Sequence, residues 1–173
     1  MMKKWILAIV IAGVFVLTGC TNNVKSGVES LEAGNYEEAR SSFAQEIEKG
    51  KNLDEAYRGL GIACFELEEY EAAIEAFELA VENKTEETGT LYSMMGACYI
   101  ETGEYEKALD IYTKALSMED ITDDIKQEVQ YNLIAVYENM ADWDAAKEQM
   151  ENYKKAYPED SRVDKESDFL ETR

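Results

Sequence analysis

The sequence contains no histidine and few basic residues, and each shortage excludes a class of function. Without histidine there is neither a Ser–His–Asp triad nor a histidine-ligated metal site. Lysine and arginine together number 17 against 37 aspartates and glutamates, which gives a formal net charge of −20. Nucleic acid needs a basic face to neutralise its phosphates, so this charge argues against a nucleic-acid partner. The acidity predicts a solvated, self-repelling surface, with an acidic docking face as the alternative.

The chain has three cysteines, Cys20, Cys64 and Cys98, and their spacing fits no zinc motif. Cys64 and Cys98 lie among apolar neighbours in segments of helical periodicity, where a thiol behaves as a small hydrophobic residue. We predict two buried free thiols, with a Cys64–Cys98 disulfide as the alternative for an exported chain. There is no glycine-rich phosphate loop, and carboxylates are too numerous to single out an acid–base pair. We therefore predict no catalytic residues, no cofactor, no metal, no small-molecule substrate and no enzymatic activity.

The first twenty residues have the order of a secretory signal. Lys3 and Lys4 precede an uncharged apolar run at 5–16, and Leu17-Thr18-Gly19-Cys20 follows. The run is shorter than the roughly 20 apolar residues that span a membrane comfortably. The ending resembles the bacterial lipobox, which implies removal of the signal peptide, residues 1–19, and lipidation of Cys20. An uncleaved anchor helix with an incidental cysteine is the alternative.

A motif recurs along the chain at intervals close to 34 residues. In each copy an aromatic residue precedes an alanine by three positions, and the alanines are spaced by 34, 35 and 38 residues. A large apolar residue follows each alanine, and three-and-four apolar spacing predicts pairs of amphipathic helices joined by tight turns. The aromatic–alanine pairs are Tyr36 and Ala39, Tyr70 and Ala73, Tyr105 and Ala108, and Trp143 and Ala146; the large residues are Phe43, Phe77, Tyr112 and Met150.

This pattern resembles the tetratricopeptide repeat family, in which an aromatic residue, Leu-Gly, tyrosine, alanine, phenylalanine and proline recur in that order. The resemblance covers residues 22–158 and implies an all-α fold, a right-handed α-solenoid of about four helix–turn–helix units. We place the units at 20–53, 54–88, 89–122 and 123–158, followed by a C-terminal capping helix and tail at 159–173. The residues that the resemblance assigns to repeat packing are Gly27, Ala39, Phe43, Tyr57, Leu60, Gly61, Ala73, Phe77, Ala80, Gly96, Tyr99, Ala108, Tyr112, Ala146 and Pro158.

The fourth unit and the C-terminus depart from the pattern. Ile134 stands where glycine is expected, which predicts a wider or shifted helix pair. Extra residues near 118–124 predict a longer loop before this unit. Its acidic residues lack the spacing and glycine of a calcium loop, so we predict a solvated loop, with a weak divalent-ion contact as the alternative. These acidic residues are Glu119, Asp120, Asp123 and Asp124, and the residues predicted to cover the end of the stack are Val163, Phe169 and Leu170.

In tetratricopeptide proteins the first helix of each unit lines the concave face. Family members that bind a C-terminal carboxylate use lysine and asparagine there, whereas this chain has only Arg58 in that region. A mixed apolar and acidic groove favours an amphipathic or basic protein segment. Ile62, Phe65 and Ile100 fit a place in the core equally well. The candidate groove residues are Glu55, Arg58, Ile62, Phe65, Glu66, Ser93, Ala97, Ile100, Glu101, Tyr131, Ala135 and Glu138.

These observations predict a binding module rather than an enzyme. The expected function is that of a lipid-anchored adaptor or scaffold, which holds an unidentified protein or peptide at the extracytoplasmic face of the cell membrane. The alternative is a structural subunit, or a self-associating component, of an envelope assembly or secretion complex. The membrane contact is expected to come through the lipid, because the acidic surface disfavours anionic lipid.

Overall fold

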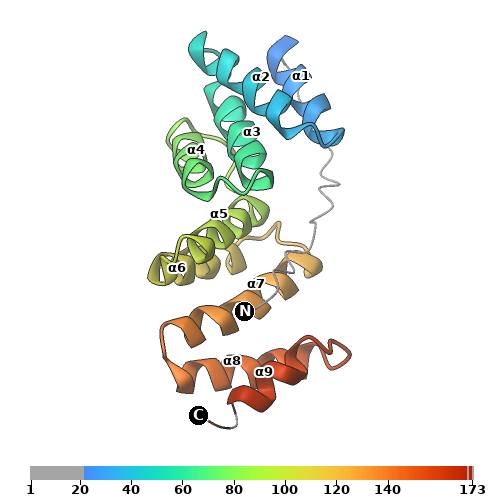
Figure 1. Ribbon diagram of the computed structural model, residues 1–173, viewed down its shortest axis with the longest axis vertical. Coiled ribbons are helices and arrows are strands. Elements are labelled where there is room, and N and C mark those ends of the chain that lie inside the picture. Colours follow the sequence, from blue (N-terminus) through green and yellow to red (C-terminus); the bar gives the residue numbers. More distant parts are fainter. Residues whose placement is uncertain (1–21, 171, 173) are drawn as a thin grey trace.

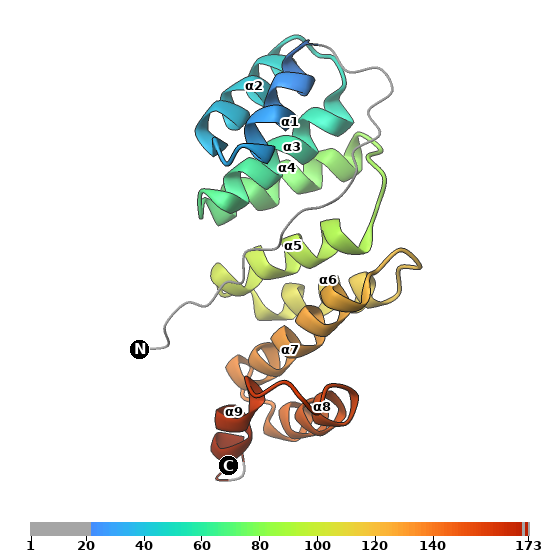
Figure 2. The ribbon, with the colours of Figure 1, turned by 90° about the vertical axis from the view of Figure 1, so that its right-hand side faces the viewer.

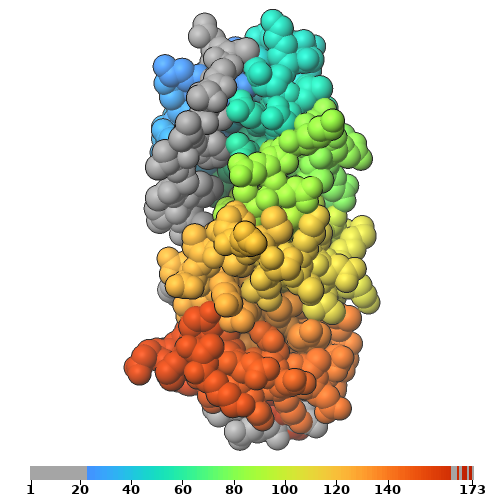
Figure 3. Space-filling model, turned by 180° about the vertical axis from the view of Figure 1, so that it is seen from behind, coloured from blue at the N-terminus to red at the C-terminus, as the bar shows by residue number. Residues whose placement is uncertain are grey.

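The computed structural model of the chain describes residues 22–170 and Thr172. The helices in this part form one elongated stack, along which the chain runs from one end to the other (Figures 1 and 3). The described residues contain no strand, and the predicted all-α solenoid is confirmed. The helices are α1 (Asn22–Glu32), α2 (Tyr36–Glu48), α3 (Leu53–Glu66), α4 (Tyr70–Glu82), α5 (Gly89–Glu101), α6 (Tyr105–Leu116), α7 (Asp123–Asn139), α8 (Trp143–Ala156) and α9 (Val163–Leu170).

The first eight helices form two layers. In the series α1, α3, α5 and α7 each helix contacts its neighbours in the series, and together we call these four helices the first-helix layer. The helices α2, α4, α6 and α8 form the second-helix layer, and each contacts the helix before it and the helix after it in the chain (Figure 2). Within the described residues, no two helices of the second layer contact each other. One side of the stack is therefore lined by first helices, which is the arrangement that a solenoid of helix pairs requires.

Glycines of the first helices allow the paired helix to come close. A Cβ on Gly61 would lie 2.5 Å from the ring of Phe77, and one on Gly96 would lie 2.4 Å from the ring of Tyr112. Neither ring is exposed to solvent at all. Burying such a side chain stabilises a fold by about 1.5–3 kcal/mol. The glycine–aromatic contact is therefore the packing element that the sequence repeats, and Gly27 faces Phe43 in the first unit in the same way.

The fourth unit achieves the same packing with different side chains. Ile134 is buried in a cluster with Ala146 and Met150, which stands where the other units have a ring. Methionine is unbranched and fills irregular spaces, so it can accommodate the added isoleucine volume. In this unit the first helix carries a large side chain, Ile134, where the other units have glycine, and the second helix carries Met150 where they have a ring. Both side chains are buried.

The extra residues before the fourth unit lengthen a helix, and the prediction of a longer loop is wrong. Segments 83–88 and 117–122, which precede α5 and α7, are equally long, but α7 has 17 residues against 13 in α5. The Thr122 hydroxyl accepts a hydrogen bond from the Ile125 N–H, and Asp123 and Asp124 occupy the first turn of α7. Carboxylates there interact favourably with the positive end of the helix dipole. These two aspartates therefore belong to a helix start and not to a loop.

The C-terminal helix α9 closes the stack only in part as predicted. Val163 and Leu170 are buried against the fourth unit. Phe169 does not cover the end: it is 41 % exposed and meets the edge of the Trp143 ring, with ring centroids 6.2 Å apart. Pro158 is also exposed, because it lies in the turn after α8, and the prediction that it packs between repeats is wrong.

Cys64 and Cys98 are buried free thiols. Burial raises the pKa of Cys64 to about 11 and that of Cys98 to about 12, since a thiolate would lose its hydration inside the core. The structure thus has the thiols that we predicted and not the alternative disulfide. Both residues belong to the largest hydrophobic cluster, which joins the second and third units.

Candidate binding surface on the first-helix layer

The predicted lipidation site, Cys20, lies outside the described residues. Among the residues that are described, none of the helices has both the length and the apolar character needed to cross a membrane. In the same part of the chain there is no group of three or more cysteine, aspartate and glutamate side chains placed to hold a metal ion. Asp120 of the acidic loop instead accepts a hydrogen bond from the Gly89 N–H at 3.0 Å. The groove residues predicted from the sequence lie on α3, α5 and α7, so the candidate surface is the face of the first-helix layer.

In α3 the predicted groove residues divide into core and surface. Ile62 and Phe65 are 6 % and 9 % exposed and belong to the main hydrophobic cluster, so their assignment to the groove is wrong. Phe65 is held there by an edge contact with the Tyr70 ring, at a centroid distance of 6.2 Å. The physical reason is that the turn into α4 brings Tyr70 across the end of α3.

The polar candidates of α3 remain partly accessible: Glu55, Arg58 and Glu66 are half-buried. The pKa of Glu55 is raised, first by burial and then by the neighbouring charge of Asp54, while Arg58 opposes the shift. A desolvated carboxylate gains from a cationic partner more than a fully hydrated one does. Glu55 is therefore a group to which a basic ligand would be attracted.

Helix α5 is buried on more sides than the periodicity indicated. It contacts α3, α4, α6 and α7, so little of its circumference meets solvent. Ser93 is consequently 5 % exposed, and the prediction that it contacts a partner is wrong. Ala97 and Ile100 are half-buried, with Ile100 packed against the main cluster, and Glu101 is exposed. The third unit therefore contributes a narrow apolar strip that ends in a carboxylate.

Helix α7 continues this surface with Tyr131, Ala135 and Glu138, all half-buried. Because α3 contacts α5 and α5 contacts α7, the candidate residues of the three units lie on neighbouring helices of one layer. The apolar candidates Ala97, Ile100 and Ala135 are half-buried, and each helix also carries a carboxylate close to them in sequence, Glu101 on α5 and Glu138 on α7. Such a mixture of side chains can bind an apolar segment bearing positive charge. No candidate on it has the arrangement of a nucleophile with an adjacent base.

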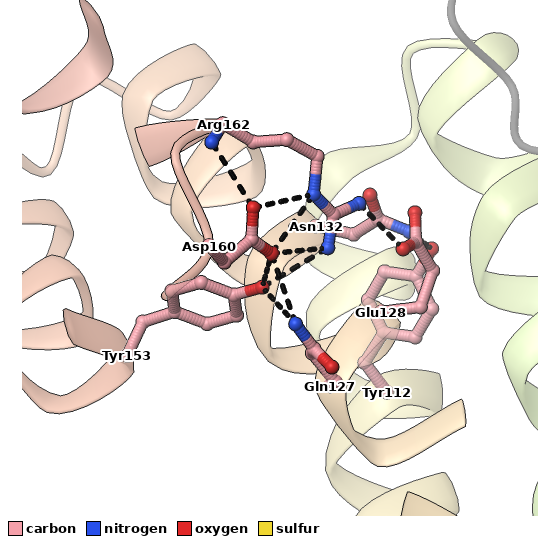
Figure 4. A network of polar contacts seen from close by, with 7 residues as sticks. All are labelled: Tyr112, Gln127, Glu128, Asn132, Tyr153, Asp160 and Arg162. Atoms are coloured by element: carbon pink, nitrogen blue, oxygen red, sulfur yellow. Dashed lines mark hydrogen bonds and ion pairs between the residues drawn. The ribbon is translucent and has the colours of Figure 1, made fainter. Parts of the chain in front are cut away.

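At the C-terminal end of this surface lies a polar network that joins α7, α8 and the segment before α9 (Figure 4). The Arg162 guanidinium donates to Glu128 at 2.8 Å, to Asp160 at 2.8–3.1 Å and to the Tyr153 hydroxyl at 3.0 Å. Asp160 also accepts from Tyr153 at 2.6 Å and from the Gln127 amide at 2.9 Å. Beside it, Asn132 donates to the Tyr112 hydroxyl at 3.1 Å.

The network fixes the protonation of its members. The hydrogen bonds from Arg162 are the main cause that lowers the pKa of Asp160 far below its usual range. The same pairing raises the pKa of Arg162. Burial, followed by the hydrogen bond to Asp160, raises the pKa of Tyr153 to about 12. Arg162 therefore remains a cation and Tyr153 a neutral donor across the physiological range.

Arg162 and Glu128 are not among the predicted site residues, although their spacing along the chain contains a signal that pairs them. The two residues are 34 positions apart, which is the repeat period. Arg162 thus stands one repeat period after Glu128, just beyond the fourth unit. Extending the period beyond the fourth unit would have set Arg162 at the position equivalent to Glu128, with the opposite charge.

Family profiles match three parts of the chain. Two profiles described as "Tetratricopeptide repeat" match residues 25–87 and 128–160. A profile for "Regulator of microtubule dynamics protein 1-3" matches residues 66–141. No curated protein matches the chain by sequence.

Solved structures of low sequence identity share the fold. MamA from Desulfovibrio magneticus RS-1 is 19 % identical with a TM-score of 0.74, and the alignment covers 88 % of this chain and 86 % of that one. YrrB, described as a TPR protein with an unusual peptide-binding site, is 20 % identical with a TM-score of 0.68, over 79 % of this chain and 68 % of that one. The chain contains tetratricopeptide repeats, and its fold is that of a tetratricopeptide-repeat solenoid.

Proposed function

We propose that the chain is an interaction module whose first-helix layer binds an amphipathic or basic segment of another protein. The observation that carries the proposal is the surface formed by Ala97, Ile100 and Ala135, beside the carboxylates of Glu101 and Glu138. The chain's high net negative charge adds a long-range attraction for cationic segments. The description of YrrB as having a peptide-binding site supports the proposal by analogy of fold.

The test is crosslinking in cells, followed by affinity purification and mass spectrometry. Glu101→Lys reverses a charge on the first-helix layer, and Glu75→Lys reverses an exposed charge on α4 of the second layer as the matched control. We expect the first variant to lose the crosslinked partner and the second to retain it. Equal recovery of the same partner by both variants would refute a binding surface on the first-helix layer.

We further propose that a lipid on Cys20 holds this module at the extracytoplasmic face of the cell membrane. Support comes from the basic start, the short apolar run and the Leu17-Thr18-Gly19-Cys20 ending. Cys20→Ser should release the protein from membranes without unfolding it, and Thr21→Ser is the matched control. If the Cys20 variant still fractionates with membranes after a carbonate wash, the lipid assignment is wrong and an uncleaved helix explains the attachment better.

A further inference from the structure

Glu128 and Tyr131 have the chemistry of a site for a guanidinium group. Both lie on α7, three residues apart and therefore on one side of the helix. A carboxylate accepts the guanidinium N–H groups, and an aromatic ring attracts the cation to its face. In this chain the group bound there is its own Arg162: Nη1 lies 2.8 Å from Glu128 Oε2, and Cζ lies 4.4 Å from the Tyr131 ring centroid.

Arg162 reaches this site from a short terminal segment. The residues 157–162 connect α8 to α9, and α9 has eight residues and contacts α8 alone among the described helices. The Arg162 side chain is 34 % exposed, so a competing cation can approach from solvent. Opening this segment would break few apolar contacts compared with unfolding a complete helix pair.

The segment can leave without stranding a charge. Asp160 pairs with Arg162 only two residues away, through Nε at 3.0–3.1 Å and Nη2 at 2.8 Å, so the two move together. An uncompensated buried charge is what makes a broken ion pair costly. Here the released guanidinium retains Asp160, and Glu128 would receive the incoming cation. Exchange of one guanidinium for another is thus close to balanced in charge.

We propose that Glu128 and Tyr131 form an arginine-binding subsite at the C-terminal end of the first-helix layer, and that Arg162 is a built-in competitor that a partner's arginine displaces. This inference rests on the proposed function, because it concerns the same surface, and it specifies one residue of the partner segment. When a site is partly occupied by the chain itself, the apparent affinity for a ligand equals the intrinsic affinity multiplied by the fraction of molecules whose site is open.

The test uses the full chain and a fluorescent peptide amide of three Leu-Arg-Ala-Leu repeats, with a peptide that has citrulline in place of arginine as the neutral control. Arg162→Gln removes the competing cation and keeps a polar side chain. We expect this variant to bind the arginine peptide at least about tenfold more tightly than the unaltered chain, with no gain for the citrulline peptide. Glu128→Gln combined with Arg162→Gln should abolish the gain.

A second measurement uses the unaltered chain, because a change in binding by Arg162→Gln could also arise from disorder of α9 in that variant. Hydrogen exchange of the unaltered chain should become faster in residues 163–170 when the arginine peptide binds, because the peptide releases the segment. Unchanged or slower exchange there would overturn the inference, and so would equal affinity of the unaltered chain and Arg162→Gln, or no binding to either. If the peptide binds equally to both but is lost in Glu101→Lys, the inference fails while the proposed function stands.

Discussion

The contact between Gly61 and Phe77 gives a prediction in which one substitution has opposite effects in two backgrounds. A methyl group added by Gly61→Ala would sit 2.5 Å from the Phe77 ring, which is completely buried. Overpacking a core costs about 1–3 kcal/mol. Alanine in place of glycine inside a helix returns about 0.5–1 kcal/mol. We therefore expect Gly61→Ala to lower the free energy of unfolding by up to about 2.5 kcal/mol.

In a Phe77→Ala background the ring is absent and the added methyl has space. Phe77→Ala alone should cost about 3–5 kcal/mol. Adding Gly61→Ala to it should then stabilise by about 0.5–1 kcal/mol, because only the helix-propensity gain remains. Urea denaturation followed by far-ultraviolet circular dichroism measures the four proteins of this double-mutant cycle. If Phe77→Ala does not fold, Phe77→Leu supplies a milder background with the same expected change of sign.

Gly34→Ala is the matched control. Gly34 has a φ of +74°, and a Cβ added there would have no neighbouring atom within 4 Å, so alanine strains the backbone without meeting another side chain. It should destabilise by the same amount in both backgrounds. If Gly61→Ala also behaves identically in both, the glycine–aromatic contact does not limit the packing of these helices, and the reasoning is refuted.

Three further outcomes follow from the polar network and the thiols. Arg162→Ala should lower the free energy of unfolding in urea by about 1.5 kcal/mol. This value is the low end for charged hydrogen bonds, because the Arg162 side chain is one-third exposed. Arg162→Lys is the comparison and should lower the free energy of unfolding by less. The lowered pKa of Asp160 contributes stability that is complete above its unfolded pKa of about 3.9 and is lost as the pH falls below that value. Below about pH 4, the urea midpoint of Asp160→Asn should therefore depend less on pH than that of the unaltered chain. Parallel curves for the two proteins would contradict this. Cys64 and Cys98 should resist iodoacetamide at about pH 8 in the folded chain and react fully in guanidinium chloride, as mass spectrometry can show; rapid labelling of the folded protein would contradict their burial.

The fold could be predicted from the sequence because its repeating contact is steric. A glycine twelve positions before an alanine and a ring four positions after it indicate two helices in close contact, and the structure places Gly61 against Phe77 and Gly96 against Tyr112. The start of α7 was also predictable, since Thr122 followed by two aspartates is a typical helix N-terminus. The clustering of four acidic residues conceals this signal, because only Asp123 and Asp124 lie in the first turn of the helix.

The candidate surface was harder to predict, because periodicity shows which side chains share a face and not how many helices surround it. Ser93 has the spacing of a groove residue, yet the helix that carries it is surrounded by four others. Phe65 has the same spacing, and a ring from the next helix covers it. The pairing of Arg162 with Glu128 depends on an incomplete fifth repeat, which has no aromatic–alanine signature to reveal it.

The position of α5, with four helical neighbours, also bears on how the chain would come apart. In a linear stack each unit is stabilised by its neighbours, so a terminal unit has half the support of a central one. Among the described helices, α1 contacts only α2 and α3, and α9 contacts only α8. Thermal fraying, a processive protease or a pulling force at either terminus would thus remove the end helices first. The buried tyrosines and methionines around α5 would persist as the last ordered part.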